Sequence, residues 1–342
     1  FCATLSPSQN TKPCLLPQHP PTWQLAISAR IHMSDLDILN AAFTRIEQLN
    51  AFYDDAIPWA AIEAGFMYQG QKIHFASRAN GIFKPSQIKH GALSIKTVVP
   101  RTGRINIYND YQSSDDYYRY ALQAGDVHRG PNRYLWQSKE LGQPFIYFHG
   151  ISPGFYTALW PCFIYEIKDL GSQHSYCNIY VGLNDPQNHL PPLVDGHYSI
   201  PTTFERRYAV RETRTRLHQS SFRQAVLTAY SNKCAMTGLP TTHLLDAAHI
   251  IPDADDRGEA SIQNGIALSK LHHSAFDKYL IGIDGDLTIH ISEEVMASSD
   301  GPLLELGIKD LHGKYLSIPE QEQLQPNRDF LTARFEAFLR EN

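Results

Sequence analysis

The chain has 342 residues, of which 42% are hydrophobic, and it carries 30 Lys and Arg against 35 Asp and Glu. At roughly 100–200 residues per domain, this length predicts two domains, and the apolar content excludes a globally disordered chain. No segment reaches the roughly 18 consecutive apolar residues of a membrane span, so a soluble protein is expected. The net charge of −5 argues against indiscriminate coating of nucleic acid but is compatible with a local basic surface.

The five cysteines are widely spaced, and no Cys-x-x-Cys pair occurs among Cys2, Cys14, Cys162, Cys177 and Cys234. This spacing indicates neither a zinc ribbon nor a disulfide framework. A reducing, cytoplasmic setting fits such cysteine usage best.

Residues 1–32 are expected to form a disordered extension, because five prolines interrupt a run of Ser, Thr, Gln and Asn. Met33 follows and is a candidate start of the natural protein. Ser34 or Asp35 is then placed to cap a helix that runs to about Leu49.

Residues 33–183 are rich in aromatic and β-branched residues, punctuated by Gly and Pro. This composition predicts a mixed α+β or barrel-like domain of short strands. The strands are expected at 92–98, 104–108, 144–148 and 158–167, with a helix near 134–141.

Residues 184–219 are expected to be a linker, since their first half holds three prolines and two turn-forming pairs. The second half is strongly basic and is expected to neutralise DNA phosphates without reading sequence. A solvated helix face is the alternative for the same residues, which are Arg206, Arg207, Arg211, Arg214 and Arg216.

Residues 220–342 form the third zone, which begins with a helix from Ser220 and ends with an amphipathic helix over 328–342. A hairpin is expected around Asp284 and Gly285. Between the first helix and the hairpin, the sequence predicts a strand over 244–250 that contains His249 near its end, a second short strand over 264–268, and a helix over 269–278 capped by Ser269.

His273 and Asp277 are four residues apart on that last helix, so their side chains project from the same face. An imidazole and a carboxylate in this relation supply half of a divalent-metal site. The strand–loop–strand–helix order brings His249 beside them.

The run from Cys234 to Asp277 resembles the HNH endonucleases of the ββα-metal superfamily. Fourteen residues separate His249 from Asn264, eight separate Asn264 from His273, and three separate His273 from Asp277. The resemblance covers roughly residues 220–290 and implies a C-terminal ββα-metal nuclease domain.

The resemblance also implies a role for each matching residue. His249 is the general base, Asn264 holds the loop and orients that base, and His273 and Asp277 are metal ligands. Alanine at 248 departs from the family, many members of which place a ligand there, and Asp246 or water is the expected substitute. His272 is expected to be structural, with a phosphate contact as its alternative.

The implied reaction is hydrolysis of a phosphodiester bond with one divalent ion, Mg²⁺, Mn²⁺ or Co²⁺. An imidazole with an ordinary pKa near ~6.5 suits the transfer of the water proton at neutral pH. No phosphate-binding Gly-x-x-x-x-Gly-Lys-Ser/Thr loop occurs, so no nucleotide cofactor is expected.

The domain order, an aromatic-rich N-terminal domain before the nuclease, resembles modification-dependent restriction enzymes with an SRA/PUA-like reader of modified bases. That resemblance implies a double-stranded DNA partner bearing modified cytosine, and a role in phage defence. Such a reader stacks an extruded base on aromatic rings. The candidate pocket residues are Asp116, Tyr118, Tyr120, Trp136, Arg78 and Asn80, although most of the eighteen tyrosines must be core residues.

Two other functions remain open for the same sequence. The chain is alternatively a nonspecific HNH nuclease effector with a regulatory N-terminal domain, or a DNA-binding protein whose HNH site has decayed, as Ala248 suggests. A homodimer is expected if both DNA strands are cut, because one HNH site serves one strand.

Overall fold

The structure is a computed structural model that describes residues 35–99, 117–171, 175–182, 193–194, 197–198, 203–252, 255, 258, 260–299 and 301–342. The predicted extension at 1–32, the predicted strand at 104–108 and most of 184–200, the first part of the predicted linker, lie outside these residues.

A long helix, α1 (Asp35–Tyr53), opens the described chain where the sequence predicted one. Its apolar side chains recur every three or four residues and are buried. The Asp35 carboxylate accepts hydrogen bonds from the backbone N–H groups of Lys89 and His90, which ties the start of the helix to a loop.

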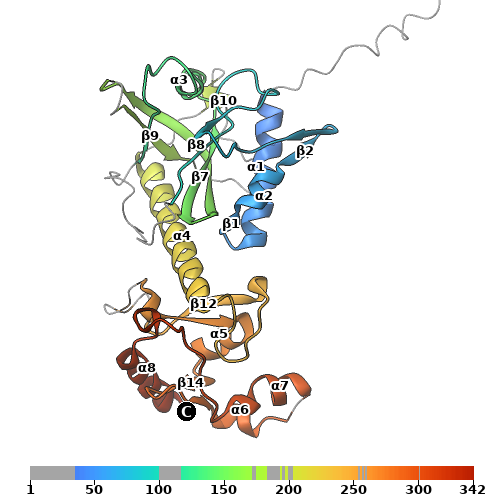
Figure 1. Cartoon of the computed structure of the whole chain (residues 1–342), viewed down its shortest axis with the longest axis vertical. Helices are drawn as coiled ribbons and strands as arrows, with labels where there is room; N and C mark the ends of the chain where they lie inside the picture. The colour runs from blue at the N-terminus through green and yellow to red at the C-terminus, as the bar shows by residue number, and fades with distance from the viewer. Residues whose placement is uncertain are drawn as a thin grey trace, which may run out of the picture. The chain divides into compact units, whose positions relative to one another are not determined.

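Short elements follow α1 and lead into a mixed sheet, in which β7, β8 and β9 lie side by side (Figure 1). The sheet has the order β4-β5-β7-β8-β9-β6, with β1 paired to β8; β5 and β7 run parallel and the other pairs run antiparallel. The elements of this region are β1 (Ile57–Pro58), α2 (Trp59–Ala64), β2 (Phe66–Tyr68), β3 (Gln71–Ile73), β4 (Ile82–Phe83), β5 (Ser94–Lys96), β6 (Tyr118–Ala121), α3 (Asn132–Leu141), β7 (Phe145–Ser152), β8 (Phe155–Lys168) and β9 (Tyr176–Val181).

The central strands are buried on both faces. Phe145, Ile146, Tyr147 and Phe148 are successive residues of β7, and all four are buried. Helices α1 and α3 contact β8, and a later helix, α4 (Thr203–Ala229), contacts β7 and β9. Continuous apolar runs of this kind are what a strand covered on both faces requires.

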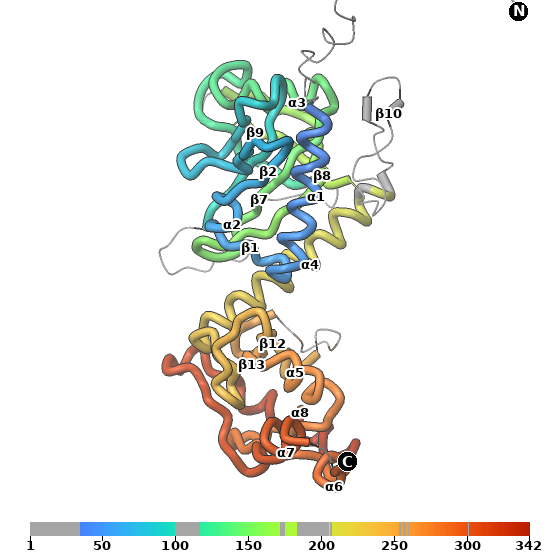
Figure 2. Tube along the Cα trace, turned by 90° about the vertical axis from the view of Figure 1, so that its right-hand side faces the viewer, coloured from blue at the N-terminus to red at the C-terminus, as the bar shows by residue number. Residues whose placement is uncertain are grey.

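Helix α4 begins well before Ser220, where the sequence analysis placed the start of a helix (Figure 2). The basic stretch expected in the linker is therefore helical from Thr203 onward. Val210 and Leu217, seven residues apart, are buried with the core of the sheet. Before α4, the structure describes only two short paired strands of residues 184–202, β10 (Leu193–Val194) and β11 (His197–Tyr198).

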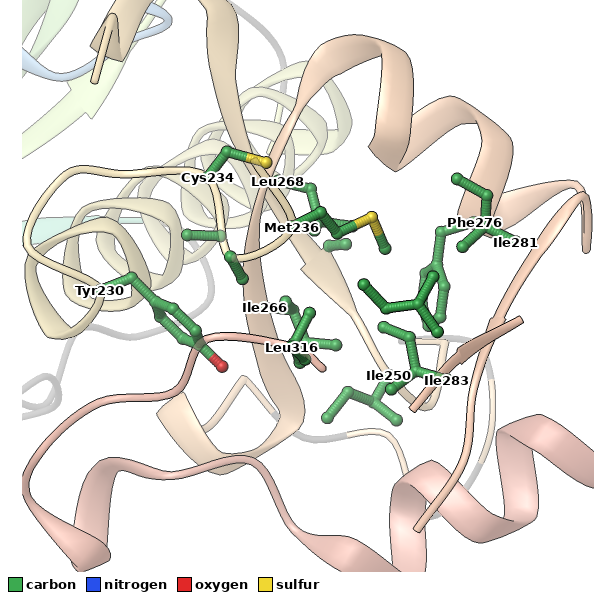
Figure 3. Close-up of a cluster of buried hydrophobic side chains, with 14 of the residues drawn as sticks. Tyr230, Cys234, Met236, Ile250, Ile266, Leu268, Phe276, Ile281, Ile283 and Leu316 are labelled. Carbon is green, nitrogen blue, oxygen red and sulfur yellow. The ribbon is translucent and has the colours of Figure 1, made fainter. Parts of the chain in front are cut away.

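The C-terminal region is built on an antiparallel pair, β12 (Leu245–His249) and β13 (Gly265–Ser269), followed by α5 (Lys270–Asp277). Ser269 caps α5 by accepting a hydrogen bond from the N–H of His272, as predicted. Figure 3 shows the core of this region, where Ile250, Ile266 and Leu268 pack with Phe276 of α5.

The remaining elements complete this core. The predicted hairpin is present, and the predicted terminal helix packs on it through Phe338, whose ring lies against Gly282. These elements are β14 (Ile281–Ile283), β15 (Ile289–Ile291), α6 (Glu293–Ala297), α7 (Pro302–Gly307) and α8 (Arg328–Glu341). Within the described ranges, no helix combines the length and the apolar character needed to cross a membrane.

Candidate active site

The pairing of β12 with β13 determines where His249 lies. The register runs from Leu245 opposite Ser269 to His249 opposite Gly265, so His249 ends one strand where the other begins. The second strand leads directly into α5, which carries His273 and Asp277. One short unit of chain thus places the predicted base and the predicted ligands on adjacent elements.

Asn264 is fully buried and holds the chain that follows His249. Its side-chain oxygen accepts from the N–H of Ile251 at 2.8 Å, and its amide donates to the carbonyl of Ile251 at 3.0 Å. Its own carbonyl accepts from the N–H of Ile250 at 2.9 Å. These contacts are the ones that a loop-fixing residue must make, and they need an amide rather than a carboxylate.

The His249 ring stacks on the ring of Phe222 from α4, with 3.9 Å between centroids and 12° between planes. Gly265, opposite His249, makes this packing feasible. A Cβ atom there would lie 2.4 Å from Val226 and 2.9 Å from the Phe222 ring. The glycine therefore lets α4 approach the strand pair closely enough to orient the imidazole.

His273 lies between two carboxylates. Its Nδ1 is 3.0 Å from Oδ2 of Asp246, and its Nε2 is 3.2 Å from Oδ2 of Asp277. Burial alone would lower the pKa of His273, but the hydrogen bonds to both carboxylates outweigh it and raise the pKa to about 9. Burial would likewise raise the pKa of Asp246, yet the bond to His273 and the nearby Arg223 hold it below its usual range.

The donor chemistry suits a divalent cation, because one imidazole and two carboxylates are the ligand types of Mg²⁺, Mn²⁺ and Co²⁺ sites. Within the described residues, however, no group of three such side chains surrounds a common point. Each ring nitrogen of His273 faces a different carboxylate, so binding of an ion requires His273 to lose a proton and the carboxylates to turn toward it.

Two cations that the sequence analysis did not assign also line this site. The Arg223 guanidinium lies 3.5 Å from Asp246 and donates to the carbonyl of Leu245 at 3.0 Å. Arg223 and Lys270 contribute to a cleft of about 440 Å³ together with Asp246, His249 and His273. Arg223 follows the basic stretch of 206–216 in the sequence, and Lys270 carries no sequence signal beyond its place at the start of a helix.

Cys234 and His272 have structural surroundings. The His272 ring is buried, with Nδ1 2.8 Å from Oγ of Ser269 and Nε2 2.8 Å from the carbonyl of Gly307. The Cys234 sulfur lies 3.6 Å from the same ring and accepts from the N–H of Ser269. These contacts anchor α5 to the strand pair, and His272 is not among the residues that line the cleft.

The described residues that were predicted to form a base pocket have different surroundings. Tyr118 and Tyr120 lie on β6 with both side chains buried in the core of the sheet, where burial raises the pKa of each phenol. Trp136 of α3 packs on His128. The alternation of aromatic and polar residues in this stretch is thus the alternation of a half-covered strand.

Of the other predicted pocket residues, Arg78 forms an exposed ion pair with Glu63, Asn80 is exposed, and Asp116 lies outside the described residues.

The predicted DNA-binding arginines divide along α4. Arg207 and Arg211 are exposed, whereas Arg214 and Arg216 are half-buried. Arg216 lies 4.0 Å from Asp55 and over the ring of Trp160. Arg206 is helical, and its side chain is outside the described set. Only part of the basic stretch therefore faces solvent.

A comparison with known protein families identifies the segment that carries this site. Residues 234–284 match the HNH endonuclease family. These residues contain the β12–β13 pair and α5, so they form an HNH endonuclease domain, and by this domain the chain is a DNA endonuclease.

Two solved structures resemble the chain at 15% sequence identity. One is the modification-dependent TagI restriction endonuclease, with a TM-score of 0.27 over 72% of this chain and 81% of that one. The other is the type IV phosphorothioation-dependent restriction endonuclease ScoMcrA, with a TM-score of 0.23 over 58% of this chain and 51% of that one. No curated protein matches the chain in sequence.

Proposed function

We propose that the chain hydrolyses phosphodiester bonds of double-stranded DNA that bears modified cytosine, and that it does so with one divalent ion. The observation that carries the hydrolytic part is the convergence of Asp246, His249 and His273 on one cleft, with Asp277 bonded to His273. The cleft also holds Arg223 and Lys270, which offer positive charge to a polyanion.

In this proposal His249 accepts the proton of the attacking water. Phe222 fixes the plane of its ring, and Asn264 fixes the chain that follows it. His273, Asp277 and Asp246 hold the divalent ion, which supplies positive charge for the phosphate and the departing oxygen. Ala248 is buried and has no donor atom, so Asp246, which already reaches His273, replaces the ligand that many HNH enzymes carry at that position.

The choice of modified DNA is assigned to the β-rich region before α4. Its support is the resemblance in domain order to enzymes with a separate modified-base reader, since an HNH unit has little sequence preference of its own. A homodimer, with one site for each strand, belongs to the same proposal.

The test uses matched plasmids that carry cytosine, 5-methylcytosine or 5-hydroxymethylcytosine, each with Mg²⁺, Mn²⁺ or Co²⁺. We expect cleavage of modified plasmid only, with 5′-phosphate and 3′-hydroxyl ends. Equal cleavage of all three plasmids would establish the nonspecific nuclease instead. DNA that is bound but left uncut with every metal would establish a decayed site.

His249→Ala tests the assignment of the base. Loss of a general base typically slows a reaction by ~10²–10⁴-fold. We expect that loss in cleavage rate with DNA affinity unchanged. His90→Ala is the matched control, because the His90 side chain is exposed and only its backbone makes a described hydrogen bond. A His249→Ala rate within threefold of the parent would remove His249 from this role.

A further inference from the structure

A second cleft, of about 640 Å³, lies in the β-rich region and shares no lining residue with the cleft of His249. Its volume falls in the range of small-molecule sites, roughly 300–1,000 Å³. Its lining includes two cations and several aromatic or apolar side chains, which are Trp59, Arg78, Lys96, Val98, Phe155 and Tyr156.

Two cations meet around one aromatic ring in this cleft. The ammonium of Lys96 lies 5.1 Å from the centre of the Trp59 ring, and the guanidinium of Arg78 lies 5.5 Å from it. Tyr156 adds a second ring, 5.9 Å from that of Trp59. Cation–π contacts of this kind stabilise charge that is partly removed from water.

Lys96 is the unusual member, since its side chain ends in the cleft and only 8% of the residue is exposed. Its ammonium donates to the carbonyls of Ser77 and Arg78. Among the described residues, none brings a carboxylate within ion-pair distance of it. Burial and the like charge of Arg78 both lower the pKa of Lys96.

A buried cation without an anionic partner costs free energy that a bound anion would recover. Arg78 is available to the same anion, because its partner, Glu63, is an exposed carboxylate at 2.9 Å. The pair is bidentate, since Nη2 of Arg78 also donates to the second Glu63 oxygen at 3.0 Å, but both side chains are exposed. Water therefore weakens the pair, and a ligand oxygen can take the place of Glu63. The cleft is therefore chemically matched to an anionic oxygen group.

The rim of the cleft is apolar and is held in place by close packing. Val98 is 63% exposed, and Phe155 is half-buried beside it. A Cβ atom on Gly150 of β7 would lie 2.8 Å from the carbonyl oxygen of Thr97 and 3.2 Å from Cα of Val98. The glycine thus allows the segment that carries Val98 to lie directly against β7.

We propose that this cleft binds one nucleotide of the DNA substrate, with its phosphate beside Lys96 and Arg78 and its base or sugar against Trp59, Val98 and Phe155. The proposal rests on the proposed function, since it takes DNA as the substrate. It places the nucleotide contact of the β-rich region on residues other than Tyr118 and Tyr120.

The first experiment measures the alkylation rate of a thiol introduced into the cleft by Val98→Cys. The substitution is made in the full chain together with His249→Ala, so that the DNA stays intact. Cys162, Cys177 and Cys234 are buried, and mass spectrometry of peptides separates the new thiol from Cys2 and Cys14. We expect saturating duplex with 5-methylcytosine to slow alkylation at least ~10-fold at this position, following the closure of the cleft by a nucleotide.

The matched control is Leu141→Cys, at an exposed position at the end of α3 that does not line the cleft. Its alkylation should change less than twofold with DNA. Full alkylation of Val98→Cys while DNA is bound would overturn the proposal.

The second experiment measures DNA affinity by fluorescence anisotropy as a function of salt. Each phosphate-contacting cation that is removed should weaken binding and reduce the salt slope by about one. We expect Lys96→Met and Arg78→Gln each to raise Kd by ~5–50-fold, and Lys72→Met, at an exposed position of β3, by less than twofold. Arg78→Gln keeps the test valid if Lys96→Met does not fold, because the Arg78 side chain is exposed.

The two proposals fail separately. If DNA protects Val98→Cys from alkylation but the parent protein cuts no plasmid, the proposed function is overturned and the cleft assignment stands. A parent that cuts DNA while Arg78→Gln and Lys96→Met bind like the parent would overturn the cleft assignment alone. A parent that binds no DNA would overturn both.

Discussion

The HNH domain and the β-rich region build their sites in different ways. In the HNH domain, Asp246, His249, His273 and Asp277 come from one strand pair and the helix that follows it. In the β-rich region, the cations and rings of the second cleft come from α2, β5, β8 and the loop before β4. The first site is made by neighbours in sequence and the second by strand pairing over long separations. A site of the first kind can be identified from spacing, whereas one of the second kind requires the sheet.

Among the variants that compare the two regions, the largest effect is expected for Gly265→Ala, at a residue that has no side chain. The new Cβ would meet Val226 and Phe222 at 2.4 and 2.9 Å, and strand and helix must separate to admit it. Because Phe222 orients His249, we expect cleavage to fall by about 10²-fold, the loss that a misplacement of 1 Å can produce.

Gly301→Ala is the control for Gly265→Ala, since a Cβ there meets nothing within 4 Å. Cleavage kinetics and thermal melts of both variants make the comparison. Parent-like cleavage by Gly265→Ala would show that the contact between α4 and the strand pair does not position His249, the proposed base.

Asn264→Ala should have the next largest effect, on stability. It leaves the buried N–H and C=O of Ile251 without their partners, and each such loss costs about 1–3 kcal/mol. We expect the free energy of unfolding to fall by about 2–4 kcal/mol in urea titrations.

Gln263→Ala, at an exposed neighbour, is the comparison for Asn264→Ala and should change the unfolding free energy by less than 1 kcal/mol. A loss below 1 kcal/mol for Asn264→Ala would mean that the HNH loop is held by other contacts.

Asp277→Ala tests the metal assignment with a more moderate effect. Removing one of three proposed ligands should raise the Mn²⁺ concentration for half-maximal cleavage by about 10-fold or more, since even outer-sphere partners of a metal typically contribute 10–100-fold in affinity. Mn²⁺ titrations of the cleavage rate provide the measurement.

Asp286→Ala, which removes an exposed carboxylate from the hairpin, is the control for Asp277→Ala. If the Asp277→Ala titration superimposed on that of the parent, Asp277 would be only a helix-surface carboxylate.

The smallest expected effect, Tyr118→Phe, distinguishes core from pocket in the β-rich region. The Tyr118 hydroxyl is buried and has no hydrogen-bond partner among the described residues, so its removal should be neutral or stabilising by up to about 1 kcal/mol. DNA affinity should stay within twofold of the parent in the anisotropy assay, whereas Lys96→Met weakens it. A fivefold loss of DNA affinity in Tyr118→Phe would instead support the assignment of Tyr118 to a base pocket.

Much of the HNH domain could be predicted from sequence because its signals are local. The cap at Ser269, the helical spacing of His273 and Asp277, and the turn at Asp284 and Gly285 each depend on a few adjacent residues. The packing of Phe222 on His249 could not be predicted in the same way, because it joins two elements that are separated by a turn and a loop.

The β-rich region was predicted less completely. Strands β7 and β8 were expected from their apolar runs, but β6 was interpreted as a pocket because tyrosines suit a strand face and a ligand site equally well. The sequence analysis began the helix at Ser220 and left a helix as the alternative for the preceding arginines, whereas α4 begins at Thr203. Val210 and Leu217 are helical core positions only once a sheet is present to cover them.

Helix α4 contributes to two separate cores. Val210 and Leu217 pack with the sheet, whereas Phe222, Val226 and Leu227 belong to the core of the HNH domain. An uninterrupted helix of 27 residues joins these positions, so loss of either core frays a helix that the other core needs. Denaturation of the described chain from 35 onward should therefore be a single cooperative transition, in which the calorimetric and van't Hoff enthalpies agree, rather than two transitions.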